Sequence, residues 1–121
     1  MRLHSASIAA MLATASALKI TQPGQNDIVN VSQDWQVCWD YVDPDPQSFC
    51  LYLTNYKFYP PQTFYLRQVT TNWRCSSIPG TCYSNFRSSG YRVRASPCGD
   101  PETIFAETAD LTAKQPSCPS Q

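Results

Sequence analysis

The chain has 121 residues with nine basic and nine acidic side chains, so its formal net charge at pH 7 is zero. This balance lacks the basic excess of nucleic-acid-binding proteins, and we expect no nucleic-acid partner. The chain has six cysteines, and its one histidine and both methionines lie within the first 11 residues.

Residues 1–17 predict a secretory signal peptide. Arg2 and His4 precede an uncharged apolar stretch that ends at Ala15-Ser16-Ala17, and small residues at this spacing are typical of signal peptidase sites. We place the cleavage after Ala17, with Ala15 as a second position two residues earlier. The apolar run is shorter than the ~20 residues that span a bilayer. The sequence therefore predicts export, followed by removal of the histidine and both methionines.

The expected product, residues 18–121, has the size of a single domain. It keeps eight basic and nine acidic residues. Its last residues lack the hydrophobic tail of a lipid-anchor signal, so we expect no membrane anchor. These features predict a secreted, extracellular and monomeric protein.

Short strands separated by Pro, Asn, Asp and Gly predict an all-β domain. Apolar residues alternate in residues 35–41, where Val37, Trp39 and Tyr41 share a face, and likewise in residues 49–54 and 91–95. Weaker candidates are residues 18–21, 27–31, 63–69, 81–87 and 103–109. About seven or eight strands at this spacing predict a β-sandwich.

Six cysteines in a short exported chain predict up to three disulfides, which stabilise a small core. They contain no closely spaced Cys-x-x-Cys pair, so we favour disulfides over a metal site and expect no metal and no cofactor. The turn-rich segment between Cys75 and Cys82 suggests that these two pair with each other. The remaining connectivity stays open. The six residues are Cys38, Cys50, Cys75, Cys82, Cys98 and Cys118.

Five short segments carry a resemblance to a known family. They are Leu18-Lys19-Ile20-Thr21-Gln22-Pro23, Val37-Cys38-Trp39-Asp40, Phe49-Cys50-Leu51-Tyr52-Leu53-Thr54-Asn55, Tyr59-Pro60-Pro61 and Gly90-Tyr91-Arg92-Val93. In this order the chain resembles the fungal Ser/Thr-rich GPI-anchored membrane family, which shares the N-terminal domain of yeast cell-wall beta-1,6-glucan synthesis proteins. The resemblance implies an immunoglobulin-like β-sandwich, and it supplies no catalytic residues.

The chain departs from that family in having no Ser/Thr-rich stalk or anchor signal and in its additional cysteines. The departures imply a short, free, secreted form. A small cysteine-bearing secreted fungal protein also fits the profile of an effector, although that profile names no target.

An enzymatic role is the least favoured of the interpretations. Without histidine, residues 18–121 cannot form a Ser-His-Asp or Cys-His site. Carboxylates remain as a conceivable acid and base of a polysaccharide hydrolase, but their surroundings favour turn and solvated positions, and they lack the ligand pattern of a calcium loop. These carboxylates are Asp40, Asp43, Asp45, Glu102 and Glu107.

Aromatic residues around a Pro-Pro turn form the candidate binding surface. Exposed rings there would stack on sugars or on a partner protein, but we favour the interpretation that alternate rings pack inward while the others cover a sheet edge. An outward stripe of Arg67, Arg87, Arg92 and Arg94 is either a site for an acidic partner or a solvated face, and we favour the solvated face. Asn30-Val31-Ser32 is a sequon, so Asn30 is a candidate glycosylation site. The surface residues are Tyr56, Phe58, Tyr59, Pro60, Pro61 and Tyr65.

Two functional hypotheses follow. The preferred one is a non-catalytic fungal effector that binds an unidentified protein or polysaccharide on a host or neighbouring surface. The alternative is a structural cell-wall protein associated with the fungus's own beta-glucan.

Overall fold

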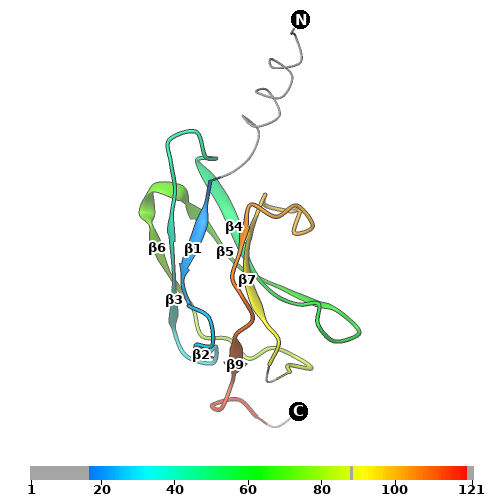
Figure 1. The fold of residues 1–121 in the computed structure, drawn as a ribbon. Coiled ribbons are helices and arrows are strands. Elements are labelled where there is room, and N and C mark those ends of the chain that lie inside the picture. Colours follow the sequence, from blue (N-terminus) through cyan, green and yellow to red (C-terminus); the bar gives the residue numbers. More distant parts are fainter. Residues whose placement is uncertain (1–16, 88, 120–121) are drawn as a thin grey trace, which may run out of the picture.

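The computed structural model describes residues 17–87 and 89–119, so nearly all of the predicted signal peptide lies outside the described residues. The described part is built from strands and one short 3-10 helix (Figure 1). The strands are β1 (Lys19–Gln22), β2 (Ile28–Asn30), β3 (Trp35–Asp40), β4 (Ser48–Asn55), β5 (Gln62–Thr70), β6 (Cys75–Ile78), β7 (Arg92–Ser96), β8 (Ala106–Glu107) and β9 (Thr112–Lys114), and the helix is η1 (Thr71–Trp73).

The strands form a three-stranded sheet in the order β1-β3-β6 and a four-stranded sheet in the order β5-β4-β7-β8, all antiparallel. A third pair joins β2 to β9 in parallel. Chain segments near the two ends of the described part therefore lie beside each other, and the all-β prediction is confirmed.

One hydrophobic core lies between the two larger sheets. Alternate residues point inward, so Val37 and Trp39 of β3 face Phe49, Leu51 and Leu53 of β4, and all five are at most 2% exposed. The ring of Trp39 meets that of Phe49 edge to face, with centroids 5.2 Å apart. Trp39 Nε1 donates to the Thr71 carbonyl at 2.7 Å, so the indole is buried without an unpaired donor.

The outer face of the four-stranded sheet is partly covered by the loop of residues 97–105. Tyr52 and Arg94 point to this outer side, yet both are only 6% exposed. The amide of Gly99 donates to the Tyr52 hydroxyl at 3.0 Å, and Arg94 Nη1 donates to the Pro101 carbonyl at 2.8 Å. The prediction that the arginines of residues 91–95 point away from the core is therefore confirmed. Arg94, however, is covered by the loop and is not solvated as expected.

All six cysteines form disulfides, which confirms the three predicted bonds. The bonds are Cys38–Cys75, Cys50–Cys98 and Cys82–Cys118. The expected Cys75–Cys82 pair is wrong, because Cys75 opposes Cys38 in the register of β6 and β3. Cys82 instead lies in the loop before β7 and reaches the segment after β9.

The strands predicted at residues 18–21, 27–31, 35–41, 49–54, 63–69 and 91–95 are confirmed within a few residues. Residues 81–87 form a loop instead of a strand. The region 103–109 contributes only the two-residue strand β8. Strands β6 and β9 were missed because Cys-Ser-Ser-Ile and Thr-Ala-Lys are short and weakly alternating.

Candidate binding surface

The tip of the β4–β5 hairpin, residues 56–61, is exposed at every position. The hairpin extends outward from the two sheets, at the lower right of Figure 1. Tyr59 is 92% exposed, and Tyr56 and Phe58 are 46% and 44% exposed. Pro60 and Pro61 complete the tip and carry no backbone N–H donor. The structure therefore presents three aromatic side chains on one projecting turn.

Asn55 closes the base of this turn from inside the fold. Its side chain is fully buried, and its Oδ1 accepts from the amides of Lys57 and Phe58 at 3.2 and 3.3 Å. Its Nδ2 donates to the Ser89 carbonyl at 3.0 Å. A side-chain amide used in this way substitutes for backbone pairing where the strand ends. Asn55 thus fixes both the start of the tip and its distance from the loop before β7.

Arg87 holds the far side of the tip. Its Nη2 donates to the Pro60 carbonyl at 2.7 Å and its Nη1 to the Phe58 carbonyl at 3.3 Å. Gly90, with φ of +85°, lies so close that a Cβ at this position would be 3.0 Å from Phe58 Cε2. The loop before β7 therefore supports the tip, and the planar guanidinium suits two nearby carbonyls.

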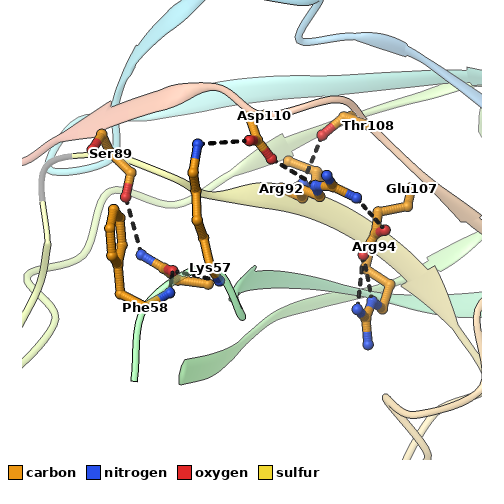
Figure 2. A network of polar contacts seen from close by, with 10 residues as sticks. Lys57, Phe58, Ser89, Arg92, Arg94, Glu107, Thr108 and Asp110 are labelled. Carbon is orange, nitrogen blue, oxygen red and sulfur yellow. Dashed lines mark hydrogen bonds and ion pairs between the residues drawn. The ribbon is translucent and has the colours of Figure 1, made fainter. Parts of the chain in front are cut away.

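A network of ion pairs lies beside the tip on the outer face of β7 (Figure 2). Arg92 pairs with Asp110 at 2.7 Å and with Glu107 at 3.1 Å, while Arg94 pairs with Glu107 at 2.8 Å. Lys57 of the tip reaches Asp110 at 3.3 Å. These groups line a cavity of about 330 Å³. The network anchors the tip to β7 and to the segment after β8.

The pKa directions in this network follow from its pairing. The hydrogen bond from Arg92 holds the pKa of Asp110 below its usual value, with a smaller contribution from Lys57. The same hydrogen bond, together with that to Glu107, raises the pKa of Arg92. Both groups therefore keep their charges at neutral pH, and the cavity presents fixed donors and acceptors.

The aromatic rings predicted for binding are only partly brought together. Arg94 lies over the ring of Tyr56, with its guanidinium carbon 5.0 Å from the centroid. Tyr65, 57% exposed, packs edge to face on Tyr52 at 5.8 Å and shares the outer face of the sheet with Tyr56. Phe58 is instead close to Gly90. The candidate surface is therefore a projecting tip with Tyr56 and Tyr65 beside it.

A second aromatic group was missed in the sequence and packs against the core, with Tyr91 buried and the other three rings half-buried. Phe64, Tyr83, Phe86 and Tyr91 form a run of tilted and stacked rings, with Phe86 and Tyr91 at 4.6 Å and 9°. Burial raises the pKa values of Tyr83 and Tyr91. The Tyr91 hydroxyl donates to Gln62 Oε1 at 2.7 Å and accepts from the Arg87 amide. This stack attaches the Arg87 loop to β5 and β7.

Three of the five carboxylates considered for catalysis have structural contacts. Asp45 accepts from the amides of Ala17 and Val42 at 2.6 and 2.9 Å, so it closes the turn before β4. Glu107 is engaged by two arginines, and Glu102 accepts from the Tyr56 hydroxyl at 2.7 Å. Within residues 17–87 and 89–119, no three His, Cys, Asp or Glu side chains gather as a metal site.

The described part of the chain also contains no helix long and apolar enough to cross a membrane.

Comparisons with known proteins identify fungal relatives. The chain is 31% identical over 106 residues to an uncharacterized protein of Schizosaccharomyces pombe, a match that covers 88% of this chain and 30% of the relative. It is 31% identical over 87 residues to a UPF0619 GPI-anchored membrane protein of Aspergillus fumigatus, covering 71% of this chain and 39% of that protein. The chain thus spans about a third of the length of these curated relatives.

No family model matches the chain, and no solved structure matches it. The relatives support the fungal, GPI-anchored part of the resemblance seen in the sequence. On this evidence the chain is homologous to part of two fungal proteins, one of which is a GPI-anchored membrane protein.

Proposed function

We propose that this protein is a non-catalytic extracellular binding module whose contact surface is the β4–β5 tip, with Tyr56 and Tyr65 beside it. The observation that carries this proposal is the 92% exposure of Tyr59 on a turn held by Asn55 and Arg87. Aromatic side chains that are already held in place lose little conformational entropy on binding. Rings of this kind are enriched at the centres of interfaces.

An immunoglobulin-like sandwich is the fold that we infer for this module. Its support is the division of the N-terminal segment between β1, which pairs with β3, and β2, which runs parallel to β9. Sandwich domains of this class carry binding loops at the ends of rigid sheets. The hairpin tip is such a loop.

The partner that we propose is a protein or polysaccharide on a host or neighbouring surface, which would make the protein an effector. Three disulfides and the absence of histidine from residues 18–121 support a durable, non-catalytic role outside the cell. Cleavage of a polysaccharide by the purified protein, abolished by an Asp or Glu substitution, would contradict the non-catalytic part.

The test compares two exposed aromatic residues at opposite ends of β5. Purified protein is screened against extracellular host proteins and insoluble polysaccharides, and the Tyr59→Ala and Trp73→Ala variants are measured on each ligand found. Trp73 is the matched control because it is 49% exposed and follows the far end of β5. We expect Tyr59→Ala to weaken binding at least about tenfold and Trp73→Ala to leave it unchanged. Equal effects of the two variants would refute the tip as the contact.

A structural cell-wall role is the second candidate, and it is favoured by the GPI-anchored relative. In this case the tip would contact the fungus's own beta-glucan. Tagged full-length chain would stay in washed cell walls and would be released by Tyr59→Ala. Complete release of the unsubstituted chain into the medium, without binding to glucan, would exclude this candidate.

A further inference from the structure

The segment around β2 carries chemistry that the binding tip does not use. Side chains alternate along Ile28–Ser32, so that Val29 and Val31 are buried at 8% and 0% while Ile28, Asn30 and Ser32 point outward. Asn30-Val31-Ser32 is the one Asn-x-Ser/Thr sequon in the chain. The structure therefore places both polar residues of the sequon on the outer side of a short strand.

The Asn30 side chain is held in one orientation by Ser32. Its Oδ1 accepts from the Ser32 amide at 3.0 Å and from the Ser32 hydroxyl. Among the described residues, Asn30 Nδ2 has no hydrogen-bond partner. The carbonyl end of the amide is thus engaged and the nitrogen, the atom that receives a glycan, is left for modification.

A shallow hollow lies beside Asn30. Its volume is about 260 Å³, and its lining includes Asn30, the Ile28 side chain and the half-buried Trp35. Ile28 is 67% exposed, which is high for a large aliphatic residue on a strand. Trp35 Nε1 is buried and has no hydrogen-bond partner in the described part of the chain. The hollow therefore combines the uncovered apolar surface of Ile28 with the half-buried indole ring of Trp35.

We propose that Asn30 carries an N-linked glycan whose first sugar ring lies over Ile28 in this hollow. Asn30 and Ile28 are two residues apart on the same side of β2, so a ring attached at Nδ2 starts next to the Ile28 methyl groups. The less polar face of the ring covers the aliphatic side chain, and the sugar hydroxyls face water.

The covalent step uses a lipid-linked oligosaccharide diphosphate as the co-reactant. Asn30 Nδ2 forms a bond to the anomeric carbon of the first sugar, and the bond from that carbon to the phosphate oxygen breaks. The lipid diphosphate leaves with the electron pair, and the amide nitrogen gives up one proton. Because the transfer occurs in the secretory lumen, the inference rests on the extracellular placement in the proposed function.

The occupancy test uses the full chain behind an added secretion leader in a yeast host, so the result does not depend on native export. We expect an intact mass above that of the polypeptide by one oligosaccharide, and loss of this excess after treatment with peptide N-glycosidase. Asn30→Gln and Ser32→Ala should abolish the excess, whereas Ser32→Thr and the control Asn72→Gln should keep it. A folded, secreted chain with no added mass would overturn the proposal.

The placement of the sugar is tested by the ¹³C-methyl signals of the isoleucines. The Ile28 signal should be shifted relative to the Asn30→Gln protein, and the shift should persist when an endoglycosidase trims the glycan to its first sugar. Ile104, 48% exposed in the loop of residues 97–105, is the control whose signal stays constant. Coincidence of the Ile28 signals would overturn the placement. Neither readout involves the tip or a binding partner, so failure here is distinct from failure of the proposed function.

Discussion

Two aromatic groups on consecutive parts of the chain have opposite environments. The hairpin tip exposes Tyr56, Phe58 and Tyr59, whereas Phe64 begins a stack that continues through the loop before β7 to the fully buried Tyr91. Among the residues that the structure describes, the tip rings contact no other aromatic ring, whereas the rings of the stack pack on one another. The comparison shows a division of roles. The stack holds the loop that carries Arg87, and Arg87 holds the tip, so the tip rings keep their position without being buried.

The largest expected effect is a difference in the free energy of unfolding between a substitution in the ring stack and one in the tip. Tyr91→Ala removes a fully buried ring and its two hydroxyl hydrogen bonds, and we expect it to lower the free energy of unfolding by about 3–5 kcal/mol. Tyr59→Ala, at 92% exposure, should change it by less than about 0.5 kcal/mol. Denaturant unfolding of both variants measures the difference, and similar values would show that the tip is part of the core.

The next effect concerns the covalent support of the stack. Replacing both Cys82 and Cys118 by serine releases the loop that carries Tyr83, Phe86 and Arg87. We expect a loss of about 2–4 kcal/mol in the free energy of unfolding, because the unfolded chain gains freedom. The same measurement tests it, and weaker ligand binding should accompany the loss. An unchanged unfolding free energy would show that the ring stack holds the loop without the disulfide.

Arg87→Ala tests the link between the groups directly. It removes the hydrogen bonds to Phe58 and Pro60, and we expect a stability loss of about 1 kcal/mol together with weaker ligand binding. The matched control is Arg67→Ala, which removes a hydrogen bond to the Ser77 carbonyl away from the tip. Calorimetry should show a similar stability loss for both variants, whereas binding assays should show weaker ligand binding for Arg87→Ala alone. Equal binding by the two would mean that the tip is positioned without Arg87.

The smallest effect is the acid response of the tip base. Since Arg92 lowers the folded pKa of Asp110, the pair stabilises the fold above the unfolded value of about 4 and loses this contribution as pH falls through the folded pKa. Asp110 is 40% exposed, so screening keeps the contribution below about 1 kcal/mol. A carboxyl NMR titration should give a low pKa that rises toward the usual value in Arg92→Ala. The ring stack should not respond over this range.

The sequence was sufficient to predict the strands in which apolar and polar residues alternate strongly. In β3 and β4, large apolar residues occupy every second position, and the core forms from these side chains. The sequence located the candidate surface but left the exposure of its rings open, and a local constraint explains the outcome: a Pro-Pro turn between two strands cannot pair as a strand. Tyr56, Phe58 and Tyr59 are exposed for this local reason.

Contacts between distant segments were not predictable. The fate of Cys75 depends on the register of β6 against β3, which a short strand of Cys-Ser-Ser-Ile does not signal. Residues 81–87 have the composition of a strand, but Tyr83 and Phe86 instead stack with Phe64. Likewise, Arg94 looks like a surface residue until the loop of residues 97–105 covers it. Each of these outcomes is decided by packing partners seven or more residues away in the chain.

The arrangement of the three disulfides has a mechanical consequence. If tension were applied to the two ends of the chain, the shortest covalent route would pass from Cys38 to Cys75, along residues 75–82, and from Cys82 to Cys118. After unfolding, this route would lengthen by the reach of one short segment, about 25 Å, rather than the roughly 280 Å of the full stretch between Cys38 and Cys118. Between Cys38 and Cys118 the chain would therefore yield very little length to a pulling force, even with its sheets separated.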